Sequence, residues 1–162
     1  MKAGSIQRFE LNDFLLQYDF TAEVLLCKSI SSSKNLWIKK IEEGGIILDV
    51  VEGDALFYMA FEYNDTDGLF IAVNKADGKT AWSIPGRAYM YRIYGNFIFL
   101  IFIDDEGRYF LIKSSCCAGG IIWHHEVDID LAEYTIRNDY VSLVYGDGRK
   151  EVLAMETGEE ID

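Results

Sequence analysis

The stretch that decides the fold runs from Ile71 to Trp82 and reads Ile-Ala-Val-Asn-Lys-Ala-Asp-Gly-Lys-Thr-Ala-Trp. Its β-branched apolar start, its Asp-Gly turn and the Trp four residues after the glycine predict a hairpin that ends in a large apolar anchor. The same spacing recurs between Gly119 and Trp123, and between Ser33 and Trp37, where a serine takes the place of the glycine. The hairpin is therefore a repeated feature of the chain.

A second marker, a turn dipeptide followed by an apolar strand, repeats with the same period. It occurs at Asn12-Asp13, Gly53-Asp54, Gly95-Asn96 and Asn138-Asp139. These turns are 41, 42 and 43 residues apart, and the three tryptophans are 45 and 41 residues apart. Two independent markers with one period of about 42 residues indicate an internal structural repeat.

The repeat predicts an all-β fold of four antiparallel units, each with four strands. The expected strands are 5–10, 14–18, 23–28 and 36–41 in unit one; 46–51, 56–63, 69–74 and 80–84 in unit two; 88–94, 97–103, 109–113 and 121–127 in unit three; and 132–137, 140–145 and 151–155 in unit four, followed by a stub at 159–162. The 162 residues are expected to form one domain.

The strand from Phe97 to Ile103 is apolar at every position, so both of its faces should be buried. A period of about 40 residues with four strands is typical of propeller blades, whose faces are covered by neighbouring blades. The hairpins at 72–82 and 154–158 resemble the blade repeat of quinoprotein-type (PQQ-like) β-propellers. The resemblance implies a small or incomplete β-propeller in which the three tryptophans pack between adjacent blades.

The chain departs from that family in three ways. Ser33 stands where a glycine is expected, and unit four stops where its tryptophan should be. The family has six to eight blades, whereas this sequence supplies four at most. The four units could therefore close as a small ring or remain an open stack. An open stack would expose a strand edge and an apolar face, and would call for a partner or a homodimer.

Composition restricts the function. The formal net charge of −12 argues against binding to nucleic acid, which needs clustered Lys and Arg. The first ten residues lack an apolar signal core, and the longest apolar run is far shorter than the ~20 residues of a membrane helix. Three cysteines fit reduced thiols better than a disulfide framework. We therefore expect a cytoplasmic protein with no membrane partner.

Two clusters could suggest a metal site, and neither has the spacing for one. Cys116-Cys117 lacks the two-residue spacing of a zinc knuckle, and the adjacent His124 and His125 should point to opposite faces of a strand. Residues 64–68 open like a calcium loop but lack its glutamate at the twelfth position. No nucleophile elbow, phosphate loop or dinucleotide motif is present. We expect no metal, no cofactor and no catalytic residues.

The acidic residues are unevenly distributed, and this predicts the binding surface. Residues 44–86 and 129–162 hold 16 of the 27 acidic residues and only 5 of the 15 basic ones. We therefore predict a non-enzymatic module that binds a basic protein, for example an immunity protein that inhibits a toxin. The predicted contacts are Asp65, Asp67, Asp77, Asp147, Glu159 and Glu160, with the aromatic residues Tyr63 and Tyr145. The alternatives are a small subunit or sensor domain of a larger assembly and, from the resemblance alone, a quinone-dependent enzyme.

Overall fold

The computed structural model describes residues 4–42 and 45–162, and these residues form strands and turns with no helix. The strands of blade one are β1 (Ile6–Glu10), β2 (Phe14–Asp19), β3 (Val24–Ser29) and β4 (Asn35–Lys40). Those of blade two are β5 (Ile46–Glu52), β6 (Leu56–Glu62), β7 (Gly68–Asn74) and β8 (Thr80–Pro85). Those of blade three are β9 (Arg87–Tyr94), β10 (Phe97–Ile103), β11 (Tyr109–Ser115) and β12 (Ile121–Val127). Those of blade four are β13 (Leu131–Ile136), β14 (Tyr140–Tyr145) and β15 (Lys150–Ala154).

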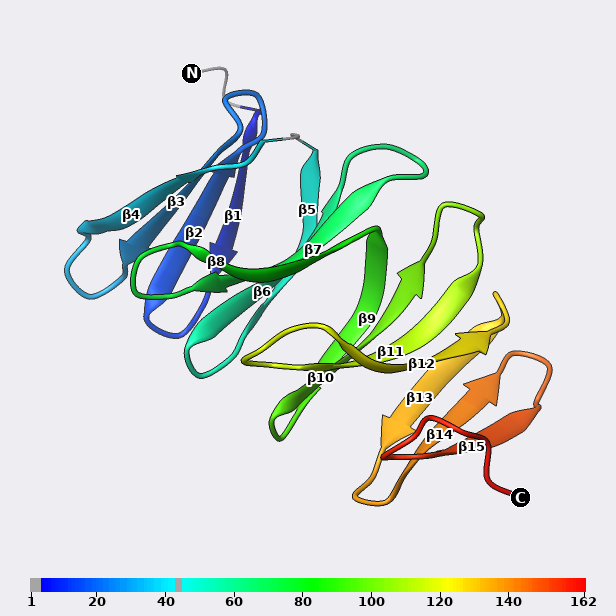
Figure 1. Ribbon diagram of the computed structural model, residues 1–162. Coiled ribbons are helices and arrows are strands. Elements are labelled where there is room, and N and C mark those ends of the chain that lie inside the picture. The colour runs from blue at the N-terminus through cyan, green and yellow to red at the C-terminus, as the bar shows by residue number, and fades with distance from the viewer. Residues whose placement is uncertain (1–3, 43–44) are drawn as a thin grey trace. The chain divides into compact units, whose positions relative to one another are not determined.

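Each blade is a separate antiparallel sheet in which neighbouring strands follow the order of the chain (Figure 1). This confirms the predicted all-β repeat of four units. The fourth sheet has three strands, and the predicted stub contributes an isolated bridge between Glu160 and Leu153. No helix that could span a membrane is found in the described ranges.

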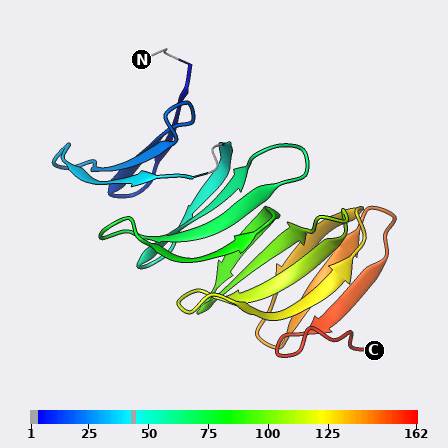
Figure 2. The same ribbon diagram turned by 45° about the horizontal axis from the view of Figure 1, so that its top comes forward.

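The chain divides into two compact units, Met1–Arg87 with blades one and two and Ala88–Asp162 with blades three and four. The single domain expected from the sequence stays a prediction. In the C-terminal unit, β13–β15 lie over one face of β9–β12 (Figure 2). The two sheets bury a joint core that includes Phe99, Leu111, Tyr134 and Leu143.

The core of the N-terminal unit lies between blades one and two. Leu16, Tyr18 and Leu25 of blade one pack with Phe57 and Phe61 of blade two. The ring of Tyr18 meets that of Phe61 edge-on, with the ring centroids 5.4 Å apart. Aromatic pairs of this geometry stabilise beyond the area that they bury.

Strand β6 is buried on both faces for its first six residues, and five of the seven residues of β10 are buried. The unbroken apolar sequence of β10 predicts burial of both faces, because a strand with one solvent-exposed face would alternate apolar and polar residues. The burial of β10 therefore agrees with the interpretation of this sheet as a propeller blade.

A tryptophan joins the two blades of each unit. Trp37 of β4 donates its indole N–H to the carbonyl oxygen of Lys75, at 2.7 Å, and its ring lies against Gly78 in the β7–β8 turn. In the same way Trp123 of β12 donates to the carbonyl oxygen of Met155, at 2.9 Å, and lies against Gly158. Each of these tryptophans therefore packs on the turn glycine of the following blade.

The turn serine of blade one has the backbone conformation of the glycines that it replaces. The φ angle of Ser33 is 56°, and those of Gly78, Gly119 and Gly158 are 74°, 66° and 72°. This left-handed conformation costs a side-chain-bearing residue roughly 1–2 kcal/mol. The β2–β3 turn, which has no glycine, likewise uses a positive φ of 58° at Glu23.

Replacing Ser33 by Gly should therefore stabilise the protein. We expect a gain of about 0.5–1 kcal/mol, because the relief of strain exceeds the added chain entropy of a glycine in the unfolded state. Urea denaturation would measure it. Ser32→Gly is the control, since Ser32 has no positive φ and glycine there should be neutral or destabilising. A loss of stability in Ser33→Gly would contradict the strain argument.

Candidate functional site: the acidic loops

The acidic residues predicted from the sequence lie at both ends of their blades. Strand β7 runs from the β6–β7 loop, which holds Asp65 and Asp67, to the β7–β8 turn, which holds Asp77. Seven residues of strand span about 23 Å, so Asp77 lies on a different surface from Asp65 and Asp67. In blade four the same separation divides Asp147, before β15, from the residues that follow β15.

The β6–β7 loop is held in shape by its own polar side chains. Asn64 Oδ1 accepts hydrogen bonds from the backbone N–H groups of Thr66 and Asp67, both at 2.8 Å. Asp67 Oδ2 accepts from Asn64 Nδ2 at 2.9 Å. These bonds form an Asx turn with neutral donors only, so none of them pairs the Asp67 carboxylate with a cation. Asp65 is exposed at the tip of the same loop.

The remaining predicted carboxylates differ in how far their charge is balanced. Asp77 is half exposed and caps the backbone N–H of Lys79 at 2.9 Å, with the Lys79 ammonium 3.9 Å away. Glu159 and Glu160 are exposed beyond β15. Surface pairs as long as that of Asp77 contribute little, so Asp77 keeps most of its charge available.

Asp147 is already paired. Its Oδ2 lies 2.6 Å from Arg149 Nε, and its Oδ1 accepts from the Arg149 backbone N–H at 2.9 Å. That backbone hydrogen bond, followed by the guanidinium, lowers the pKa of the Asp147 carboxyl below its usual value. The same guanidinium reaches Asp128 at 2.7 Å and Asp130 at 3.5 Å. Three aspartates thus share one arginine, and the group keeps a net negative charge.

Tyr145, which was predicted to be an exposed contact, is buried. Only 2% of its surface is exposed, its hydroxyl donates to Glu151 Oε2 at 2.9 Å, and the Arg149 guanidinium lies over its ring. Burial, and then the bond to Glu151, raise the pKa of this phenol. The prediction was wrong because Tyr145 ends β14 on the face that packs against blade three.

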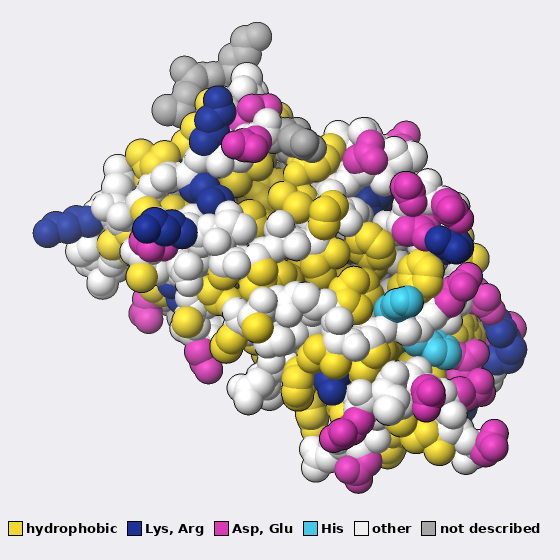
Figure 3. All heavy atoms as spheres, in the orientation of Figure 1, with side chains coloured by type: hydrophobic (Ala, Val, Ile, Leu, Met, Phe, Trp, Pro, Cys, Tyr) yellow, Lys and Arg dark blue, Asp and Glu magenta, His cyan; other side chains and the backbone are white. Residues whose placement is uncertain are grey.

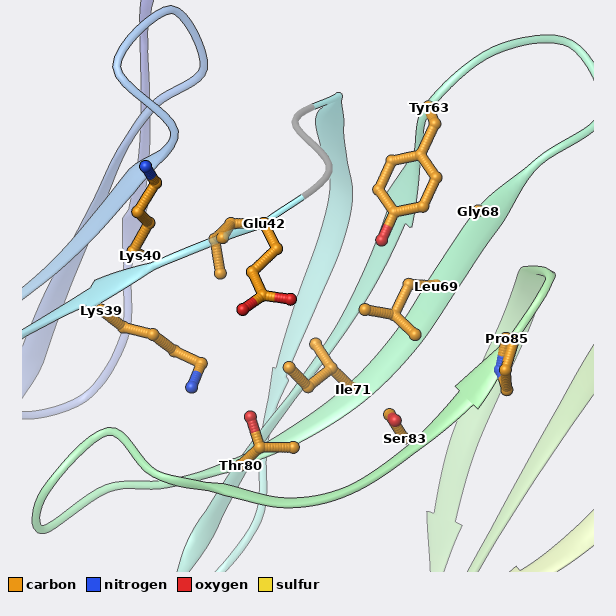
Figure 4. Close-up of a pocket in the computed structure, with 11 residues that line it drawn as sticks. Lys39, Lys40, Glu42, Tyr63, Gly68, Leu69, Ile71, Thr80, Ser83 and Pro85 are labelled. Carbon is orange, nitrogen blue, oxygen red and sulfur yellow. The ribbon is translucent and has the colours of Figure 1, made fainter.

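Tyr63, the other predicted aromatic contact, lies at a cavity beside the acidic β6–β7 loop. The cavity measures about 480 Å³ and is lined by the end of β4, the residues that follow it, and β7 and β8. Figure 4 shows the Tyr63 ring, Leu69 and Ile71 on one side and the Lys39 and Glu42 side chains on the other. Tyr63 is partly exposed, so its ring is within reach of a partner bound at this loop.

Two further acidic groups lie in loops of the C-terminal unit and were not among the predicted contacts. Asp104–Glu106 form the β10–β11 loop, where Arg108 balances Asp104 at 2.8 Å and Asp105 stays exposed. Asp128 and Asp130 flank the β12–β13 connection, which lies at the same end of the blade because β12 runs back antiparallel to β11. Figure 3 shows acidic side chains gathered over the loops of the C-terminal unit. The Asp-Ile-Asp sequence between two expected strands could have indicated the acidic group at Asp128 and Asp130.

The cysteines and histidines do not come together. Cys116 is buried and Cys117 is exposed, and His124 and His125 pair with successive residues of β11, so they point to opposite faces. His125 Nε2 lies 3.4 Å from Glu151 Oε2. No group of three His, Cys, Asp or Glu that could hold a metal occurs in the described part of the chain.

Lys113 is a buried cation between blades three and four. Its side chain is almost fully covered, its Nζ donates to the carbonyl oxygen of Met155 at 2.9 Å, and it lies 4.1 Å from the centre of the Phe97 ring. Burial lowers the pKa of its ammonium below the usual 10.5. A charged form that is disfavoured in the folded state makes stability depend on pH.

Comparing the wild type with Lys113→Met across pH should show this dependence. The unfolded chain binds more protons than the folded one between the lowered pKa and 10.5, so the wild type should gain stability relative to the variant as pH rises through that window. Urea melts at several pH values would measure it. Cys27, whose pKa burial raises to about 11, is present in both proteins and cancels. A constant difference between wild type and variant would contradict the prediction, and Lys34→Met is the exposed control.

Comparisons with known proteins identify the fold. No protein-family model matches the chain, and no curated protein matches it. Among solved structures, it is similar to the dihydro-heme d1 dehydrogenase NirN (TM-score 0.67, 12% identity, 98% of this chain and 36% of that one). It is also similar to the computationally designed Ika8 protein (0.65, 10%, 97% and 48%) and to the quinohemoprotein alcohol dehydrogenase ADHIIG from Pseudomonas putida HK5 (0.61, 9%, 96% and 33%).

These matches are β-propellers, so the chain has the blade repeat of that fold, as its resemblance to the quinoprotein type implied. The chain spans half or less of the length of each of these three proteins. At 8–12% identity a shared fold says nothing of shared activity.

Proposed function

We propose that this protein is a non-enzymatic module that forms a stoichiometric complex with a basic protein, such as a toxin that it neutralises. The observation that carries the proposal is the placement of exposed carboxylates at loop tips, foremost Asp65 and Asp67 in blade two, neither of which forms an ion pair among the described residues. Repeat scaffolds present such loops to partners, while their sheets supply rigidity. Three cysteines, an odd number, fit reduced thiols and a cytoplasmic location.

Charge and apolar contact have separate roles in the proposed complex. Exposed carboxylates attract a basic partner and speed its association, an effect that salt screens. Affinity depends more on aromatic groups that become desolvated, and Tyr63 is the aromatic residue next to the acidic loop. We therefore centre the site on the β6–β7 loop and Tyr63, without Tyr145.

The proposal predicts a specific loss of association rate. Once the partner has been captured with the tagged protein from its native host, the double variant Asp65→Asn, Asp67→Asn should bind it roughly tenfold more slowly at low salt, with a smaller difference at high salt. The amides can still accept the hydrogen bonds that shape the loop. Stopped-flow or surface-based kinetics at two salt concentrations would measure the rates.

Matched controls separate the site from general charge. Asp77→Asn removes a carboxylate from the other end of β7 and should leave the association rate unchanged. Tyr63→Ala should mainly raise the dissociation rate. If the double variant and Asp77→Asn behave alike, the β6–β7 loop is not the recognition site. If the captured partner is acidic, the proposed function is wrong.

A further inference from the structure

Blade one and blade four each have a sheet face that is turned away from the core of their unit. In blade one, Leu16, Tyr18 and Leu25 point into the core, so the residues between them point to the opposite face. That face, the free face of blade one, includes Leu15, Leu26, Ile38, Arg8, Asp19 and Lys28. Its apolar residues are incompletely covered, and Ile38 is 66% exposed.

The free face of blade four follows from the same alternation. Val141, Leu143 and Leu153 point into the core of the C-terminal unit, so their neighbours point away from it. This face includes Tyr140, Val144 and Lys150, and Tyr140 is 39% exposed. Beyond β15, the chain pairs with β15 through the backbone N–H of Ile161, which donates to the Val152 carbonyl oxygen at 2.7 Å.

The hairpin bonds show which residues of blades one and four are equivalent. Ser29 N–H donates to the Lys34 carbonyl oxygen in blade one, and Ala154 N–H donates to the Glu159 carbonyl oxygen in blade four. Three residues later, Asp162 of blade four holds the position of Trp37. Cross-strand pairing likewise makes Val144 and Lys150 equivalent to Tyr18 and Leu25, which are paired in blade one.

The residues of blade two that contact blade one have equivalent residues on the free face of blade one. Phe57 pairs with Val73 in blade two, and Leu15 pairs with Lys28 in blade one. Phe61 of blade two is equivalent to Asp19 of blade one. Each pairs with the first strand of its blade, Phe61 with Ile47 and Asp19 with Ile6. On the free face of blade one, the charged residues Asp19 and Lys28 therefore stand where blade two has the apolar residues Phe61 and Val73.

The contacts between blades one and two set a register that can be transferred to the two free faces. Tyr18 meets Phe61 at 5.4 Å, and Trp37 lies 6.4 Å from Phe57. In the same register Val144 would face Asp19, which places Lys150, the cross-strand partner of Val144, beside that carboxylate.

The second transferred contact also joins opposite charges. Asp162, in the position of Trp37, would lie over Leu15, the equivalent of Phe57, and so beside Lys28, the cross-strand partner of Leu15. The charged replacements on the two free faces thus have opposite signs at both contacts. Neither Lys28 nor Asp162 takes part in an ion pair among the described residues.

We propose that the free face of blade four docks onto the free face of blade one of a second copy of this chain, in the register that joins blade one to blade two. The contact covers Tyr140 and pairs Lys150 with Asp19 and Asp162 with Lys28. The contact joins two different surfaces head to tail, so each copy offers its free face of blade one to one neighbour and its free face of blade four to another. The β6–β7 loop is not part of this contact, and the proposal is independent of the proposed function.

Charge reversal tests the contact. The wild type should be larger than a monomer in sedimentation or light scattering at micromolar concentration. Lys28→Glu and Asp162→Lys should each weaken association roughly tenfold or more, because each places like charges opposite one another. Lys34→Glu, the same change on the exposed β3–β4 loop, should leave association unchanged. Urea melts of the three variants check that each is folded.

Mixing the two variants gives the decisive result. In a mixed head-to-tail pair, Glu at position 28 of one chain meets Lys at position 162 of the other, and the second contact is the native Lys28–Asp162 pair. Association should therefore return to about the wild-type level in the mixture, although each variant alone is defective. A wild type that stays monomeric overturns the proposal. So does a mixture that associates no better than the separate variants.

Discussion

Replacing Trp123 by Ala is expected to lower the free energy of unfolding of the C-terminal unit by ~3–5 kcal/mol. The indole is 7% exposed, donates to the Met155 carbonyl oxygen at 2.9 Å, and lies against Gly158 of the next blade. Its removal leaves a cavity between blades three and four and takes one hydrogen bond from a buried carbonyl group. Urea denaturation followed by tyrosine fluorescence and circular dichroism would measure the loss.

The matched variant is Trp37→Ala in the N-terminal unit, and we expect a loss of similar size. Its N–H bond of 2.7 Å and its contact with Gly78 repeat those of Trp123. The serine at position 33 in its own hairpin does not weaken this contact, since Trp37 packs on the hairpin of the following blade. Losses under ~1 kcal/mol for both variants would refute the role of these residues between blades.

The intermediate variant Trp123→Phe separates the hydrogen bond from the packing. Phenylalanine keeps a buried ring but cannot donate to Met155, so its cost should lie between zero and that of alanine. A loss equal to that of Trp123→Ala would mean that the hydrogen bond, and not the ring, accounts for the effect.

The strands could be predicted because their signals are local. Turn dipeptides, hairpin glycines and the apolar run of β10 each lie within a few residues of the element that they specify, and the observed strand limits differ from the expected ones by at most two residues. The left-handed residues Ser33 and Glu23 were less visible, because any residue can adopt a positive φ when the surrounding hairpin imposes it.

The candidate site was harder to predict because its pairings join residues distant in the sequence. Arg149 reaches Asp128, 21 residues away, and this pairing cannot be read from the Gly-Asp-Gly turn that holds Asp147. Tyr145 looks like a loop residue from its neighbours, yet its register with Leu131 turns it into the core. The direction of β7 could have been used, since strand order alone places Asp77 opposite Asp67.

Replacing Gly78 by Ala is expected to cause the second large loss of stability, because Gly78 lies against Trp37. A Cβ atom at Gly78 would lie 2.5 Å from Trp37 Cε3, and the φ of 74° adds strain of its own. Overpacking typically costs 1–3 kcal/mol and the left-handed conformation roughly 1–2 kcal/mol, so we expect a total loss of ~2–5 kcal/mol.

Gly95→Ala is the control for the backbone contribution to this loss. Gly95 has a φ of 59°, and a Cβ atom there would meet no other atom within 4 Å, so alanine should cost only the left-handed strain. The excess for Gly78→Ala over Gly95→Ala then measures the collision with Trp37. In the double variant Trp37→Ala, Gly78→Ala this excess should vanish, because nothing is left for the Cβ to meet. An excess that persists without the indole would show that Gly78 is required for a reason other than the packing of Trp37.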